Sequence, residues 1–387
     1  MDNELTQFND IRPFEPEELP AAYDKLIANP QFHGVVKYLF PNVPFDAVAQ
    51  KMRACDTSLK FQLAFSFSFI KELLAKAARG YEMDCSSVDR SGNYTFVSNH
   101  RDIVLDSAIL DVLLVEAKFA DTCEIAIGDN LLKLDWVKDL VRINKSFIVQ
   151  RGLPMREMLV ASKQLSDYMH YVISHKKQSI WIAQRSGRAK DSNDRTSEAV
   201  LKMMTMGGEG SLVERFKQLH IVPLSISYEF DPCDYLKAAE LQQKRDDANW
   251  VKGPQDDHIS MKTGIYGNKG HIHYHCAPCI DSFLDTIPPD TPKNNLYTTI
   301  AQHIDREIHR HYQLYPSNYI ALDELRGTND FTAHYSANDK AFFDKYLADQ
   351  LAKMELPLRD NDFLHKQMLI MYANPAINQL ASNGNME

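Results

Sequence analysis

The chain has 387 residues, of which 25% are charged and 44% hydrophobic, ordinary values for a globular protein. A net charge of −9 argues against a general nucleic-acid-binding protein. Six scattered cysteines favour free thiols in a reducing cytoplasm over a disulfide scaffold. The acidic start is unlike a signal peptide, and no stretch reaches the ~18 uninterrupted apolar residues of a spanning helix. We expect a cytoplasmic protein, at most peripheral on the inner face of the cell membrane.

Residues 1–80 are predicted to form a helical N-terminal segment. Helices are indicated from Pro16, at residues 32–40 and at residues 46–55, with prolines and Asn42 between them. Farther on, Phe61, Phe65 and Phe69 recur every four residues and would form one stripe on a helix. A stripe that faces the core is the simpler interpretation, and a face that dips into a membrane is the alternative.

Residues 81–387 are predicted to form an α/β domain with a helical C-terminal extension. Short β-branched or aromatic runs alternate with apolar stretches at helical spacing, which is typical of parallel strands joined by helices. The fold class expected is a mixed, mainly parallel sheet flanked by helices. Strands are expected at 94–97, 123–127, 147–149, 179–183 and 221–228, and helices at 103–114, 131–141, 155–174 and 197–206. The polar residues 239–262 are expected to form a surface loop.

The first predicted strand of this domain ends in the polar residues 98–102, which contain His100. Open α/β sheets place their chemistry at the carboxyl ends of strands. A histidine followed within two helical turns by Asp102 and Asp106 can be a general base that a carboxylate holds in one tautomer. A His–Asp pair that only caps the helix is the alternative.

Basic residues gather in the middle of this acidic chain. Residues 131–190 contain twelve Lys or Arg and four Asp or Glu. Five basic residues come just after predicted strands, where the crevice above the sheet would bind an anion such as phosphate: Arg101, Arg151, Arg185, Arg188 and Lys190. A solvated basic face is the alternative. No dinucleotide fingerprint or P-loop is present, because the glycine-rich residues 207–210 follow a helix.

Residues 270–279 (GHIHYHCAPC) offer a competing site. On a strand, His271, His273 and His275 share one face, and Cys276 and Cys279 form a C-x-x-C pair, so zinc is conceivable. A single C-x-x-C pair, without a second pair at the spacing of zinc ligands, is weak evidence for a zinc site. No metal is expected, and a zinc-dependent hydrolase remains the less favoured hypothesis.

Four segments, in this order, resemble the motifs of the glycerolipid acyltransferases, which include lysophosphatidic acid and glycerol-3-phosphate acyltransferases. Asn99-His100 with a downstream aspartate resembles the first motif, supported by Arg101. Residues 147–151 resemble the second, phosphate-binding block. Residues 180–190, with Gly187, are similar to the third block of the soluble plant-type glycerol-3-phosphate acyltransferases, and residues 221–224, with Pro223, to the fourth. The similarity spans about residues 90–280, and the leading helices also resemble the plant-type enzymes.

Two departures from the family pattern leave alternatives open. The family places four residues between its histidine and aspartate, whereas five separate His100 from Asp106, so Asp102 remains a rival partner. The third block of the family commonly contains a carboxylate residue before its arginine. In this sequence those positions hold Gln184, Arg185 and Ser186. A catalytically silent protein that binds lipid or an acyl carrier therefore stays an alternative.

The resemblance implies that His100 takes the proton from a glycerol hydroxyl as it attacks an acyl thioester, while Asp106 steadies the imidazolium. It implies that four residues bind the acceptor phosphate: Arg151, Arg185, Arg188 and Lys190. The donor would be acyl-CoA or acyl carrier protein, and no cofactor is expected. The acceptor would be glycerol-3-phosphate, 1-acylglycerol-3-phosphate or a non-phosphate lipid hydroxyl, in phospholipid synthesis at a possible membrane surface. The acyl chain would use an apolar groove lined by residues such as Leu131, Trp136 and Leu140, or by the N-terminal phenylalanines.

Overall fold

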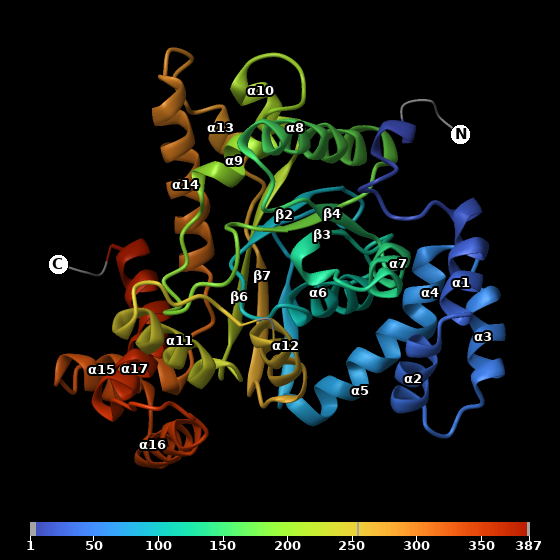
Figure 1. Cartoon of the computed structure of the whole chain (residues 1–387). Coiled ribbons are helices and arrows are strands. Elements are labelled where there is room, and N and C mark those ends of the chain that lie inside the picture. The colour runs from blue at the N-terminus through green and yellow to red at the C-terminus, as the bar shows by residue number, and fades with distance from the viewer. Residues whose placement is uncertain (1–4, 254, 385–387) are drawn as a thin grey trace.

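A seven-stranded sheet runs through the centre of the molecule in the order β1-β7-β6-β2-β5-β3-β4 (Figure 1). The computed structural model describes residues 5–253 and 255–384. Among these residues β6 and β7 pair antiparallel, and the other neighbours pair parallel. The strands are β1 Gly80–Asp84, β2 Thr95–Ser98, β3 Glu124–Gly128, β4 Ser146–Val149, β5 Ile180–Ala183, β6 Ile221–Tyr228 and β7 His271–Cys276. The predicted mixed, mainly parallel sheet is confirmed.

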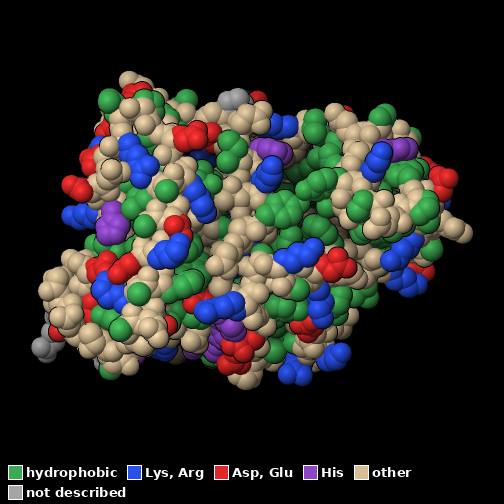
Figure 2. Space-filling model, turned by 90° about the horizontal axis from the view of Figure 1, so that it is seen from below, with side chains coloured by type: hydrophobic (Ala, Val, Ile, Leu, Met, Phe, Trp, Pro, Cys, Tyr) green, Lys and Arg blue, Asp and Glu red, His purple; other side chains and the backbone are tan. Residues whose placement is uncertain are grey.

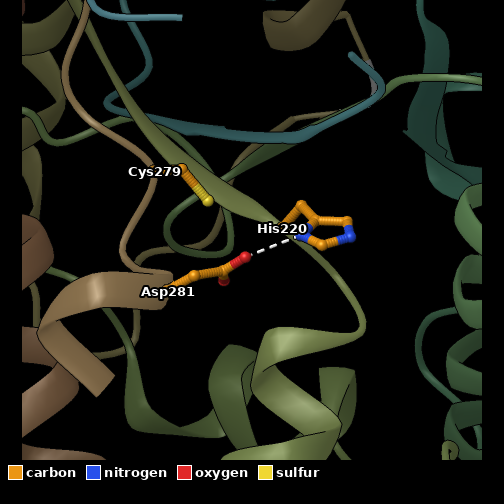
Figure 3. Close-up of side chains that lie close together, drawn as sticks. All are labelled: His220, Cys279 and Asp281. Carbon is orange, nitrogen blue, oxygen red and sulfur yellow. Dashed lines mark hydrogen bonds and ion pairs between the residues drawn. The ribbon is translucent and has the colours of Figure 1, made fainter. Parts of the chain in front are cut away.

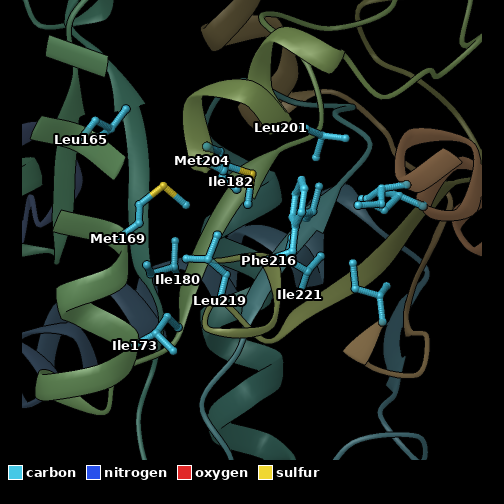
Figure 4. Close-up of a cluster of buried hydrophobic side chains, with 14 of the residues drawn as sticks. Leu165, Met169, Ile173, Ile180, Ile182, Leu201, Met204, Phe216, Leu219 and Ile221 are labelled. Atoms are coloured by element: carbon cyan, nitrogen blue, oxygen red, sulfur yellow. The ribbon is translucent and has the colours of Figure 1, made fainter. Parts of the chain in front are cut away.

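Helices cover both faces of this sheet, because side chains alternate along each strand. Phe96 and Trp181 point into the core formed with α5 and α6, whereas the adjacent Val97 and Ile182 point into the core under α8 and α9. Figure 4 shows the second core, where leucine and methionine side chains of α8 and α9 meet isoleucines of β5 and β6. The covering helices are α6 Leu105–Glu116, α7 Asp135–Ile143, α8 Met155–Tyr171, α9 Glu198–Met204 and α10 Leu212–Lys217. Each predicted helix of this region lies within a few residues of its expected place.

The N-terminal residues form a group of helices beside α7 (Figure 1). They are α1 Leu19–Ile27, α2 Pro30–Leu39, α3 Phe45–Arg53, α4 Ser58–Phe61 and α5 Phe67–Ala77, with a π-helical segment at Gln62–Ser66. Their shared core includes Phe61, which is 4% exposed, and Ile143 of α7. A core-facing position, rather than a membrane-dipping one, is therefore confirmed for Phe61. The domain boundary after residue 80 stays a prediction. In the structure, β1 begins at Gly80.

The expectation of a surface loop at residues 239–262 is wrong. Residues 239–246 belong to α11 Asp234–Asp246 and residues 256–262 to α12 Asp256–Tyr266, so most of the stretch is helical. Its polar side chains do not mark a loop, because several of them are buried as pairs. Within the stretch, Glu240 is 7% exposed and forms ion pairs with Lys190 and Lys244. Just before the stretch, in the same helix, Lys237 is 1% exposed and forms an ion pair with Asp231.

The chain after β7 is helical. The elements are α13 Asp281–Leu284, α14 Lys293–Arg310, α15 Pro316–Arg326, α16 Ala337–Ala352 and α17 Asn361–Ser382. Three of them, α15 to α17, pack with α11 around Phe343 and Tyr372 in a separate core (Figure 1). Within the part of the chain that the structure describes, every helix is too short or too polar to cross a membrane.

Candidate active site

His100 lies directly after β2 and is bonded to Asp106 in the first turn of α6. The Nδ1 atom of His100 is 2.7 Å from Oδ2 of Asp106. The same oxygen accepts hydrogen bonds from the backbone N–H groups of Arg101 at 2.6 Å and of Asp102 at 3.1 Å. Asp106 is fully buried. This geometry favours the tautomer with its proton on Nδ1 and leaves Nε2 as the basic nitrogen.

Asp102 performs a different task in the same turn. Its Oδ1 accepts hydrogen bonds from the N–H groups of Val104 at 2.9 Å and Leu105 at 2.8 Å, so it caps the start of α6. The turn formed by residues 101–104 absorbs the additional residue that separates His100 from Asp106. Of the two rival aspartates, the structure therefore brings Asp106 to the imidazole.

The position of His100 is fixed by its neighbours on the sheet. The side-chain amide of Asn99 donates to the Ile226 carbonyl and accepts from the Ile226 N–H, both at 2.8 Å. These two bonds continue the β2–β6 pairing past the end of β2. The Trp181 indole donates to Ser98 Oγ at 3.0 Å, and its ring meets the His100 ring edge-on at a centroid distance of 5.8 Å. His100 consequently has little freedom to turn away.

A cavity of about 1350 Å³ opens beside His100. Its walls are mainly apolar and come from α2, α5, α6, β3, α7 and α8. Phe65 and Phe69 of the predicted stripe, and Leu131 and Leu140 of the predicted groove, line it, whereas Trp136 packs instead in the N-terminal core. Figure 2 shows hydrophobic side chains gathered in a hollow on one face, with Lys and Arg side chains along its border. Such a cavity can hold a long hydrocarbon chain.

The four predicted phosphate ligands, Arg151, Arg185, Arg188 and Lys190, all line this cavity. Arg188 is 7% exposed, and one of its terminal nitrogens has no hydrogen-bond partner among the described residues. Lys190 forms a 2.6 Å ion pair with Glu240. Burial lowers the pKa of Lys190 to about 8, even though Glu240 acts in the opposite direction. Gly187 has a φ of +72°, a backbone conformation that suits glycine.

Arg101 does not belong to this group, so the expectation that it faces the crevice is wrong. Its guanidinium is buried and forms a 2.8 Å ion pair with Asp194. It is not part of the cavity lining, and it lies over the ring of Tyr312 at 5.6 Å from the ring centroid. The place of a residue after a strand does not determine the direction of its side chain. The ion pair with the buried Asp194 holds the Arg101 side chain inside the protein.

Five residues at the cavity were missed from the sequence because they lie in the supposed loop: Glu240, Lys244, Lys252, Asp257 and Met261. Lys244 is 2.7 Å from Glu240, and Lys252 is 3.7 Å from it. The i, i+4 spacing of Glu240 and Lys244 was a helical signal that could have pointed to them. Glu240 also supplies a carboxylate beside the third block, although it comes from a distant part of the sequence.

Pro223 lies inside the sheet, paired with Val97 of β2. Proline has no N–H to donate to this ladder, but its carbonyl accepts a bond from the Ala277 N–H at 2.9 Å. The segment after β7 is thereby attached to β6.

The structure does not assemble the zinc cluster considered for residues 270–279. His271, His273 and His275 share one face of β7, as expected, but Cys276 is fully buried on the other face. Cys279 instead lies near His220 and Asp281, the one group of three potential ligands found in the described residues (Figure 3). Nδ1 of His220 is 2.7 Å from Asp281 Oδ2, and burial raises the pKa of the Cys279 thiol to about 12. This group lies at the amino end of β6, away from His100.

Comparisons with known proteins agree with the motifs. The model of the Acyltransferase family matches residues 83–227. Among solved structures, the chain is similar to the 1-acyl-sn-glycerophosphate (LPA) acyltransferase PlsC from Thermotoga maritima, with 12% identity and a TM-score of 0.39 over 76% of this chain and 96% of that one. A search of curated proteins gives no match. The matched residues, which are fewer than half of the chain, contain the His100–Asp106 pair and the basic side chains from Arg151 to Lys190, so this part of the chain is similar to the Acyltransferase family.

Proposed function

We propose that this acyltransferase moves a fatty acyl group from acyl-CoA or acyl carrier protein to a hydroxyl of glycerol-3-phosphate or 1-acylglycerol-3-phosphate. One observation carries the proposal. The His100–Asp106 pair lies on a cavity that combines a long apolar interior with a basic mouth. An acyl chain fits the first part and a phosphate the second, so the reacting hydroxyl and thioester would meet near the imidazole.

In the proposed mechanism, Nε2 of His100 removes the proton from the acceptor hydroxyl as the oxygen attacks the thioester carbonyl carbon. The negative Asp106, bonded to Nδ1, stabilises the imidazolium that forms. When the tetrahedral intermediate collapses, the carbon–sulfur bond breaks, and the imidazolium returns the proton to the leaving thiolate. His100 thus both accepts and returns the proton, and the proposed reaction uses no cofactor.

The acceptor phosphate would bind at the basic mouth. Arg188 has an unpaired terminal nitrogen, and a guanidinium can hold a phosphate through two parallel hydrogen bonds. Burial alone would lower the pKa of Arg188, but Cys233, Asp231 and Asp102 nearby raise it, so the side chain stays charged. Arg151 and Arg185 add two more positive charges at this mouth.

The test is to offer the purified chain labelled acyl-CoA or acyl carrier protein with a panel of acceptors. We expect transfer to glycerol-3-phosphate or 1-acylglycerol-3-phosphate, and little to monoacylglycerol, which has no phosphate. Equal transfer to monoacylglycerol would contradict the role given to the basic mouth. Lipid binding without transfer to any acceptor would favour the catalytically silent alternative.

A further inference from the structure

Large hydrophobic side chains are exposed beside the cavity, on a surface that we call the α8 patch. It consists of Leu134, Met155, Leu159 and Val160, which are 45%, 79%, 55% and 69% exposed. The last three lie in the first two turns of α8, and Leu134 precedes α7. Soluble proteins seldom gather such side chains in one place unless the surface meets an apolar partner.

The α8 patch adjoins the cavity lining. Met158 and Ala161, in the same turns of α8, line the cavity. The chain enters α8 from Arg151 and Gly152, which also line it. The two segments of the patch leave the sheet next to each other, because β3 and β4 are paired up to Gly128 and Val149. A hydrocarbon chain could therefore pass between the patch and the cavity along apolar side chains.

Basic residues adjoin the residues of the same patch along the chain. Lys133, Arg151 and Arg156 are exposed, and their side chains have no partner within residues 5–253 and 255–384. Together with the half-buried Lys138 they outnumber the nearby exposed acids, Asp135 and Glu157. This local excess of positive charge contrasts with the net charge of −9 for the whole chain. Apolar side chains with interspersed Lys and Arg are the composition of surfaces that lie in a bilayer interface.

We propose that the α8 patch docks on a bilayer that contains anionic phospholipids and brings the cavity mouth to that surface. The proposal rests on the proposed function, in which an acceptor or a product is a lipid. The apolar side chains enter the boundary between headgroups and acyl chains, while Lys133 and Arg156 contact the anionic headgroups. A lipid then moves between bilayer and cavity without exposing its chain to water.

The test measures binding of the full chain to vesicles of phosphatidylcholine with and without phosphatidylglycerol. The double variant Leu159→Glu/Val160→Glu should reduce partitioning onto the anionic vesicles by about tenfold or more. The double variant Lys133→Gln/Arg156→Gln should reduce it by about fivefold per charge, and only on anionic vesicles. Neither pair is among the proposed catalytic or phosphate-binding residues, so transfer to water-soluble glycerol-3-phosphate should be unchanged.

The matched control is Phe342→Glu/Leu358→Glu, which charges two exposed hydrophobic side chains in the C-terminal helical region, at 56% and 84% exposure. The control should bind vesicles as the wild type does. Unchanged binding by Leu159→Glu/Val160→Glu overturns the proposal, and so does an equal loss in the control. Binding of acyl carrier protein, but not of vesicles, through the patch would assign it to a protein partner instead. Vesicle binding needs no catalysis, so its outcome is independent of the transfer assay.

Discussion

Replacing Asp106 by Asn tests whether a negative charge behind His100 drives the reaction. All three hydrogen bonds to the carboxylate go to Oδ2, from the imidazole and from two backbone N–H groups. An amide oxygen in that position could accept the same three bonds, so the fold should be kept. The variant removes the charge that stabilises the imidazolium. We expect transfer to slow by about 10² to 10⁴, or roughly 2.7 to 5.4 kcal/mol of transition-state stabilisation.

The assay is single-turnover transfer of a labelled acyl group, with Asp102→Asn as the matched control. Oδ1 of Asp102 accepts hydrogen bonds from the Val104 and Leu105 N–H groups at the start of α6, whereas the imidazole of His100 is bonded to Asp106. Asn caps a helix about as well as Asp. The control should therefore keep a rate within a few-fold of the wild type. The reasoning would be refuted by the reverse ranking, a crippled Asp102→Asn beside an active Asp106→Asn.

Three further predictions concern the cavity. Arg188→Ala should raise the KM for a phosphorylated acceptor by about one to two decades and leave the KM for the thioester nearly unchanged, because a charge-assisted bond contributes roughly 1.5–3 kcal/mol. Arg188→Lys should recover part of the lost acceptor affinity. A change in the thioester KM alone would assign Arg188 to donor binding. Because burial lowers the pKa of Lys190 to about 8, the KM for the acceptor should rise above pH 8, and Lys190→Arg should reduce that rise. Identical pH profiles of the acceptor KM in the wild type and the variant would exclude Lys190 as a phosphate ligand. Asp111 of α6 lines the cavity and accepts a 2.9 Å hydrogen bond from the Cys123 N–H, and burial raises its pKa to about 7. The stability that comes from its protonation is fully present below pH ~4 and is lost as the pH rises through about 7, so melting temperatures should fall less across this range for Asp111→Asn, and parallel curves would contradict the assignment.

The sequence predicted the strands of residues 94–228 and the helices α6 to α9, though not α10, because each is a local pattern. Strand periodicity, helix spacing and turn residues are all contained in short windows. The same windows pointed to His100, since it follows a strand end, and the order of the motifs indicated a resemblance to a family whose model matches residues 83–227. Asp102 remained an alternative to Asp106, because residue spacing alone does not determine the geometry of the turn at residues 101–104.

Long-range pairing explains what the sequence did not predict. Glu240, which the sequence assigned to a loop, is polar yet buried, because it meets the opposite charge of Lys190. The identity of that partner depends on the complete fold, so polarity alone indicated a loop. Arg101 turned inward for the same reason, toward Asp194. The cavity walls also depend on how the N-terminal helices pack beside α7, which no local pattern specifies.

Single-turnover acyl transfer by His100→Ala, beside the wild type, tests the central claim most directly. His100 touches the cavity and is bonded to a buried carboxylate, so its role in this account is chemical rather than structural. The variant should melt as a folded protein, bind the acyl thioester normally, and transfer the acyl group about 10² to 10⁴ times more slowly to a phosphorylated glycerol acceptor. A folded His100→Ala protein that transfers at the wild-type rate would contradict the account.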